Sequence, residues 1–156
     1  MVQVDLIDIW DQRAAEGWNA YVRAHAGGTP FHLTHWGRAI QGAYGYETPY
    51  LRARRGQDIA GVLPLTHVRS ALFGKSFISN AFAVYGGPLA EDAEAHAALD
   101  AAAWSLAQKA GVPTLEYRNR QRLRPDWPAK AETYVTFRRP LYEREDDNLK
   151  AIPRKQ

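Results

Sequence analysis

The feature that most constrains the fold is the order in which strand-like and helix-like segments follow one another. A short strand over residues 2–7 comes first, and two helical segments begin after Asp11 and after Thr34. Strands in a meander follow, and a long helix is expected over about 91–110. This order lacks the strict alternation of a doubly wound sheet. It predicts an α/β (α+β) domain with a mixed, mostly antiparallel sheet flanked by helices.

The middle of the chain has the pattern of a hairpin. A strand over 49–54 alternates apolar and polar residues, and residues 55–58 are turn-forming. The second, longer strand is expected over 59–68. Pro64 lies inside this strand and removes a backbone hydrogen-bond donor, which indicates an edge position or a bulge.

Three further strands complete the predicted sheet. The first covers 77–85, after a loop over 70–75, and ends at Gly86-Gly87. The others cover 113–117 and 133–137. The long helix lies between the strands 77–85 and 113–117. It has acidic residues in its first turn and Lys109 in its last, which matches the helix dipole.

The end of the chain has a different character from the rest. Residues 148–156 have the pattern of an opening basic helix, without a closing glycine or a polar tail. We therefore expect residues 1–142 to be the first domain of a larger protein, and 143–156 to be the start of a linker or a second domain. Surface exposed by such a truncation would favour a homodimer.

The composition excludes several classes of protein. The chain has 156 residues, 46% hydrophobic and 24% charged, which fits one globular domain and excludes general disorder. It has no cysteine, so disulfides, cysteine–zinc sites and thiol nucleophiles are excluded, and a reducing cytoplasm is the expected location. We see no signal peptide pattern and no apolar run long enough to span a membrane.

The element order and several motifs resemble a known family. The order is similar to the GNAT (acyl-CoA N-acyltransferase) architecture. The motifs are residues 29–38 (TPFHLTHWGR), 61–65 (GVLPL), 82–89 (FAVYGGPL), 134–141 (YVTFRRPL) and 148–156 (NLKAIPRKQ). In this order they resemble the FemAB family, most closely FemAB-like proteins associated with the PEP-CTERM/exosortase system.

The resemblance implies a function. FemAB proteins contain two GNAT-like domains in tandem, and characterised members transfer an amino acid from aminoacyl-tRNA to a peptidoglycan precursor. It implies that this chain is the acceptor-binding first domain of an aminoacyl- or acyltransferase, inactive without its second GNAT-like domain. The acceptor would be a cell-envelope precursor, peptidoglycan-like or exopolysaccharide-related. Two alternatives stay open: a non-catalytic ligand-binding module, and a compact CoA-dependent N-acetyltransferase.

Candidate substrate-binding residues lie in two of these motifs. Trp36 and Arg38 follow the expected Thr34 cap, where the family has a basic residue that meets acceptor phosphates. The alternative is a core tryptophan and a surface arginine. In the other motif the paired glycines would let a ligand approach the backbone, or would form a plain turn with a core tyrosine. The candidates there are Phe82, Tyr85, Gly86 and Gly87.

Cofactor and metal signals are weak. The pyrophosphate loop of a CoA-binding GNAT enzyme, Gln/Arg-x-x-Gly-x-Gly/Ala, does not occur, and the nearest segment, 108–113, lies at a helix end. We therefore expect no cofactor in this part of the protein. His32 and His35 are three residues apart but have no carboxylate neighbour in sequence, so no metal is expected. The catalytic residues are left unassigned.

Basic residues form two further groups. Arginines alternate along residues 118–124 and would share one face of an extended segment, although Pro125 and Pro128 favour a loop. Lys150, Arg154 and Lys155 are candidates for contacts with RNA or with a second domain.

Overall fold

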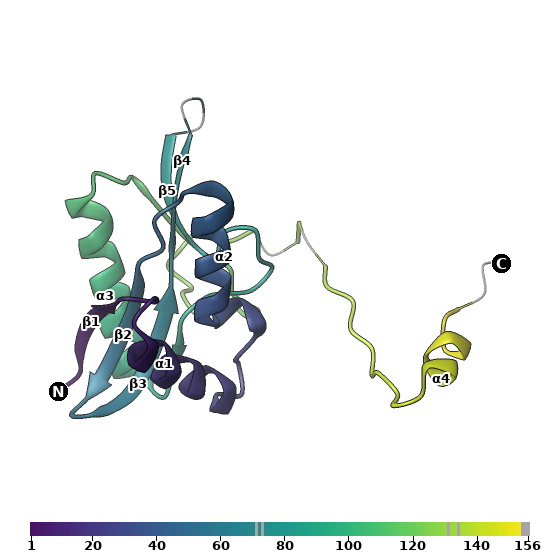
Figure 1. Ribbon diagram of the computed structural model, residues 1–156. Helices are drawn as coiled ribbons and strands as arrows, with labels where there is room; N and C mark the ends of the chain where they lie inside the picture. Colours follow the sequence, from purple (N-terminus) through teal and green to yellow (C-terminus); the bar gives the residue numbers. More distant parts are fainter. Residues whose placement is uncertain (71, 73, 131, 134, 154–156) are drawn as a thin grey trace. The chain divides into compact units, whose positions relative to one another are not determined.

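The computed structural model describes residues 1–70, 72, 74–130, 132, 133 and 135–153. The chain forms two compact units, Met1–Gln121 and Arg122–Gln156, and each is described by itself. The first unit contains all of the β-strands and the long helices of the described chain (Figure 1).

The first unit contains two small sheets. Its elements are β1 (Gln3–Ile7), α1 (Gln12–Ala24), the 3-10 helix η1 (Pro30–His32), α2 (Thr34–Tyr44), β2 (Tyr50–Arg55), β3 (Asp58–Pro64), β4 (Thr66–Ser70), β5 (Gly74–Ser79), β6 (Leu89–Ala90), α3 (Ala93–Lys109) and β7 (Thr114–Tyr117). One sheet has the order β1-β2-β3-β6 and is antiparallel throughout. The other has the order β4-β5-β7, and only its β5–β7 pair is parallel. The predicted mixed, mostly antiparallel sheet is confirmed.

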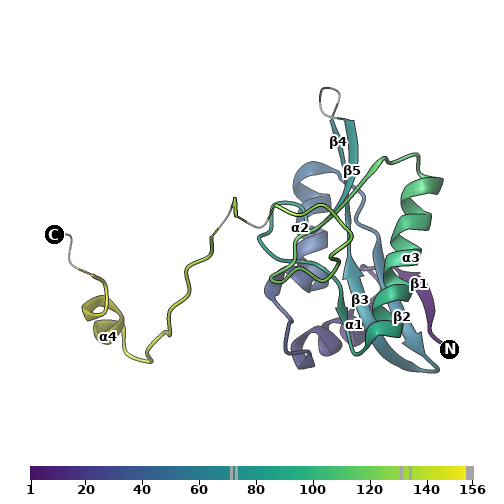
Figure 2. The same ribbon diagram turned by 180° about the vertical axis from the view of Figure 1, so that it is seen from behind.

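Helices cover both faces of the sheets. Helices α1 and α2 lie on one face and α3 lies on the other (Figures 1 and 2). Neighbouring residues of one strand serve opposite cores, as the pleat requires: Leu63 packs with Leu99 of α3, whereas Val62 packs with Trp18 of α1. The alternation along β2 and β3 therefore decides which helix each strand residue contacts.

The local capping signals are right for α1 and wrong for α2. The side chain of Asp11 accepts a hydrogen bond from the Ala14 N–H, so the cap expected for α1 is confirmed. The Thr34 cap expected for α2 is wrong. Leu33 occupies the cap position of α2, and Thr34 is a buried residue whose N–H and hydroxyl bond with the side chain of Asn19.

Two predicted strands have different bounds in the structure. The strand expected over 59–68 divides into β3 and β4 at Pro64, which lacks an N–H, and the two parts belong to different sheets. The strand expected over 77–85 instead begins at Gly74 and ends at Ser79. Beyond Ser79 the backbone turns away, and Phe82 has a left-handed conformation with φ 58° that no strand residue adopts.

The second unit differs most from expectation. Its helix, α4 (Glu145–Lys150), overlaps the helix predicted to open at Asn148 but begins three residues earlier and ends at Lys150, because three acidic residues fill its first turn and Pro153 follows its end. The strand predicted over 133–137 is not formed at its described positions, where no partner strand is present to hydrogen-bond with them. Tyr134 lies outside the described residues.

Among the residues described, no helix has the length and apolar character that crossing a bilayer requires. The predicted cytoplasmic location stays a prediction.

Candidate functional site

The candidate site is built around residues 80–88, which connect β5 to β6 and which we call the bridging segment. The two sheets part here: β5 pairs with β4 and β7, whereas β6 pairs with β3. No strand of the described chain lies within the bridging segment, so side chains have to satisfy its backbone. Interrupted strands of this kind are places where a backbone becomes accessible to a ligand.

Hydrogen bonds to η1 and α2 hold the first half of the bridging segment. The indole Nε1 of Trp36 donates to the carbonyl of Ala81 at 3.1 Å. The amide Nδ2 of Asn80 donates to the carbonyl of Phe31 at 2.6 Å. The rings of Phe31 and Trp36 meet edge to face, with centroids 4.9 Å apart. The predicted residue Trp36 therefore contacts the segment directly.

The residue after β7 holds the other side of the segment. The guanidinium of Arg118 donates to the carbonyl of Ala83 at 2.8 Å. The backbone carbonyl of Arg118 accepts from the N–H groups of Gly86 and Gly87, at 3.1 and 3.3 Å. Arg118 thus replaces part of the strand ladder that the bridging segment lacks.

His32 ties η1 to the end of the bridging segment. Its Nε2 lies 3.0 Å from the carbonyl oxygen of Gly87, which can only accept, so Nε2 carries the proton. Its Nδ1 accepts from the N–H of Thr29 at 3.2 Å and lies 2.8 Å from the Thr29 hydroxyl. The residue is 2% exposed, and burial lowers the pKa of His32 to about 4. The imidazole is therefore neutral at physiological pH.

The glycine pair is explained by packing within the protein. A Cβ on Gly86 would lie 2.4 Å from the backbone nitrogen of Asn80. A Cβ on Gly87 would lie 1.6 Å from the Asn119 side-chain oxygen. The chain's own atoms occupy the space in which a ligand was expected to approach. Tyr85 is partly exposed, and the guanidinium of Arg120 lies 5.6 Å from its ring centroid.

An exposed aromatic column stands beside the segment. The rings of Phe82 and Tyr44 are stacked, with centroids 4.4 Å apart and planes inclined by 18°. Tyr44 in turn stacks on Tyr46 at 6.0 Å and 14°. Phe82 and Tyr44 are 55% and 57% exposed. The sequence analysis singled out Phe82 but missed both tyrosines; the signal was two tyrosines on either side of Gly45, the expected helix stop.

Arg38 has contacts of a different kind. Its Nε and Nη2 donate to the backbone carbonyl of Ile9, the former at 2.8 Å, and its guanidinium lies 5.1 Å from the Trp10 ring. These contacts join α2 to the chain after β1. Arg38 makes no hydrogen bond to the bridging segment among the described residues.

The N-terminus of α3 follows β6 closely and is filled by acidic side chains. Asp92 accepts from the Ala95 N–H at 2.9 Å and from Arg55 at 2.8 Å. The Ala95 hydrogen bond, followed by Arg55, lowers the pKa of Asp92. Arg55 also pairs with Glu94 at 3.1 Å. The positive end of this helix is therefore occupied by the chain's own carboxylates.

The remaining basic candidates are distributed along the chain. β7 ends at Tyr117, so the arginines of 118–124 do not share a strand face. Arg122 donates to the carbonyls of Pro125 and Trp127, and Arg124 pairs with Asp126 at 2.7 Å. Lys150 is the exposed last residue of α4. Arg154 and Lys155 lie outside the described residues.

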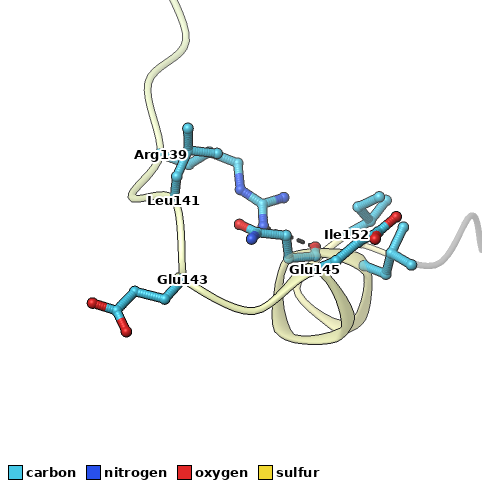
Figure 3. Close-up of a pocket in the computed structure, with 7 residues that line it drawn as sticks. Arg139, Leu141, Glu143, Glu145 and Ile152 are labelled. Carbon is cyan, nitrogen blue, oxygen red and sulfur yellow. Dashed lines mark hydrogen bonds between the residues drawn. The ribbon is translucent and has the colours of Figure 1, made fainter.

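The second unit has an open hollow beside α4. Arg139 extends toward the helix and donates to the carbonyl of Asn148, whereas Glu143 points away from it (Figure 3). Leu141, Leu149 and Ile152 give the hollow an apolar lining. It contains none of the predicted substrate-binding residues.

The described residues offer no metal centre. No group of three histidine, aspartate or glutamate side chains among them is arranged to hold an ion. The two ring nitrogens of His32 are taken up by Thr29 and Gly87.

Comparison with known proteins identifies the fold. A solved structure of a ribosomal-protein-alanine N-acetyltransferase from Brucella melitensis biovar Abortus 2308 superimposes with a TM-score of 0.52. The match covers 87% of this chain and 98% of that one, at 15% sequence identity. The chain has the GNAT fold. No family model matches the sequence, and no curated protein matches it.

Up to β7 the strands predicted from the sequence follow the observed order, and the glycine pair Gly86-Gly87 lies between β5 and β6, where the two sheets part. At 15% sequence identity the structural likeness shows the fold alone. The substrate depends on the residues of the site.

Proposed function

We propose that this chain provides the acceptor-binding part of a FemAB-type acyltransferase. The enzyme would transfer an aminoacyl or acyl group to an amine of a cell-envelope precursor, peptidoglycan-like or exopolysaccharide-related. A second GNAT-like domain would complete the donor channel, with aminoacyl-tRNA as the donor that the resemblance implies. The proposal includes Trp36, Phe82 and Tyr85 as acceptor-facing residues.

The observation that carries the proposal is the meeting of three FemAB-like motifs at one place. Residues 82–89 form most of the bridging segment and the start of β6. Residues 29–38 supply His32 and Trp36, which hydrogen-bond to it. Residues 61–65 include the part of β3 that pairs with β6. Motifs distant in sequence thus surround one segment, as expected when they serve a common site.

The N-terminus of α3 supports a donor other than CoA in this part of the protein. A pyrophosphate bound there would have to displace the Asp92 carboxylate from the Ala95 N–H and would face Glu94. Like charges at such short range disfavour binding. Glu91 adds a third carboxyl group next to the same helix end.

The chemistry needs little beyond positioning. The acceptor nitrogen attacks the carbonyl carbon of the activated ester, the carbon–oxygen bond breaks, and the proton lost by the amine goes to the leaving oxygen. Holding the amine against the ester supplies much of the rate enhancement in such reactions. A protein of this kind can act without a dedicated nucleophile, and none is assigned.

A ligand-binding experiment tests the proposal. The melting temperature of the chain is measured alone, with a nucleotide-linked sugar–peptide precursor, and with acetyl-CoA, since a ligand that binds only the folded state raises it. A rise with the precursor that Trp36→Phe reduces is expected, because phenylalanine lacks the indole N–H that holds Ala81. Phe137→Ala, an exposed change in the second unit, is the matched control.

The other outcomes decide against the proposal. A rise with acetyl-CoA alone would favour a CoA-dependent N-acetyltransferase, the activity named for the structural neighbour. No rise with the precursor would remove the acceptor-binding role. A precursor-induced rise combined with no transfer by a protein that contains both domains would favour the binding module.

A further inference from the structure

We propose that the aromatic column of Tyr46, Tyr44 and Phe82 is a subsite for a neutral carbohydrate. This inference rests on the proposed function, because it assigns the sugar portion of the acceptor to the exposed side of the bridging segment. The column is formed by the end of α2, the chain that follows it, and the bridging segment.

The geometry of the column suits the flat face of a sugar ring. The three rings are nearly parallel, with interplanar angles of 14° and 18°. Aromatic faces carry negative charge density, which attracts the polarised C–H groups on the apolar face of a pyranose. More than half of the surface of both Tyr44 and Phe82 is exposed. A ligand ring can therefore extend the stack or pack along it.

The backbone holds the Phe82 ring in the column at a conformational cost. Phe82 is the only residue other than glycine with positive φ in the described chain. Such a conformation in a bulky residue points to a constraint beyond local preference. Its neighbours explain how the conformation is maintained: the carbonyls of Ala81 and Ala83 are bound by Trp36 and Arg118.

The polar groups near the column favour hydroxyls over phosphates. Glu47 follows Tyr46 and its carboxylate is exposed, a good acceptor for sugar hydroxyls. His67 and Arg69 lie 3.3 and 3.9 Å from its two carboxylate oxygens. The positive charge of Arg69 is therefore paired with Glu47 and does not form a cationic site for a phosphate.

Of the arginines beside the bridging segment, Arg118 hydrogen-bonds to it and Arg120 lies over the Tyr85 ring. Arg118 binds the carbonyl of Ala83 and pairs with Glu116 at 2.9 Å. A nucleotide would need cations for its phosphates in addition to a stacking surface. The tyrosine hydroxyls of Tyr44 and Tyr46 instead add donors and acceptors suited to a polyol.

The test measures binding of neutral oligosaccharides to the 156-residue chain. The probes are tetramers of N-acetylglucosamine and of glucose, with uridine diphosphate as the nucleotide probe, followed by ring-proton NMR and calorimetry. We expect at least one tetrasaccharide to bind saturably, with a Kd of about 1 mM, and to shift the Tyr44 and Phe82 ring signals.

Variants separate the column from the rest of the surface. Phe82→Gly removes the ring and accepts the positive φ, and Tyr44→Ala keeps a good helix former at the end of α2. Each should weaken binding about three- to tenfold, the loss expected for a stacking contact of this size. Tyr44→Phe should retain most of the binding, and Phe137→Ala all of it.

Three outcomes overturn the inference. The first is that no tetrasaccharide binds saturably below about 10 mM. The second is binding that neither Phe82→Gly nor Tyr44→Ala weakens. The third is that uridine diphosphate alone shifts the ring signals, which would indicate a nucleobase site. Each is independent of acyl transfer. If sugar binding fails while transfer to a sugar-free amine persists, only this inference is wrong. If sugar binds and a protein that contains both GNAT-like domains transfers nothing, the proposed function is wrong.

Discussion

Acid should destabilise this protein through one buried histidine. His32 is neutral in the folded chain because its Nε2–H donates to Gly87 and its Nδ1 accepts from Thr29. A second proton, on Nδ1, would face the Thr29 N–H at 3.2 Å. Burial is the main reason that the pKa of His32 falls from 6.5 to about 4.

The sign and size of the effect follow from proton linkage. Between about pH 6.5 and 4 the unfolded chain binds a proton at His32 that the folded chain does not. The free energy of unfolding is therefore highest above this range and falls as the pH drops, by up to about 1.4 kcal/mol per pH unit. It levels off below about pH 4, after a total loss on the order of 3 kcal/mol.

Urea unfolding from pH 7.5 to 3.5 at constant ionic strength measures this loss. His32→Gln keeps an amide donor for Gly87 and does not titrate, so the difference between the two proteins cancels the other ionisable groups. The variant is expected to be less stable at neutral pH, and the gap should narrow toward pH 4. Parallel curves for the two proteins, or a His32 ring that titrates near pH 6.5 by NMR, would refute the reasoning.

Three further changes test the packing around the site. Gly86→Ala should lower the free energy of unfolding by roughly 2 kcal/mol or more, because its Cβ would lie 2.4 Å from the Asn80 nitrogen; a change under about 0.5 kcal/mol in urea would contradict this close approach. Asp92→Ala should lower the melting temperature by removing the α3 cap, and unchanged thermal unfolding would count against that cap. Thr34→Val leaves the buried Asn19 amide with fewer partners and should cost about 1–3 kcal/mol; equal stability in calorimetry would disprove the pairing.

Part of the candidate site was accessible from sequence. The predicted residues Trp36, Phe82, Tyr85 and the glycine pair all lie on or against the bridging segment. A tryptophan or a glycine pair has few structural roles, so these residues could be recognised as candidates individually. The partners that hold the segment were not recognisable, because Arg118 is far away in sequence and was seen only as one member of an arginine run.

The sequence by itself determined the local features of this protein. The Asp11 and Asp92 caps, the glycine turn at Gly56 and the apolar periodicity of α1 and α3 act within a few residues, so α1, α3 and the β2–β3 hairpin lie close to their expected positions. Such signals depend on neighbours along the chain. The folded structure keeps these local features wherever the surrounding packing is compatible with them.

Only the tertiary structure decided where strands end and which side chains meet. The strand pattern over 77–85 continues past Ser79, yet pairing with β7 stops there and the backbone enters the bridging segment. The pattern over 133–137 is as favourable for a strand, but no partner strand is present at its described positions. Strand pairing is a contact between distant segments, and its free energy cannot be assigned to either segment alone. The same reason explains why the stacking of Tyr44 on Phe82 became visible only in the folded chain.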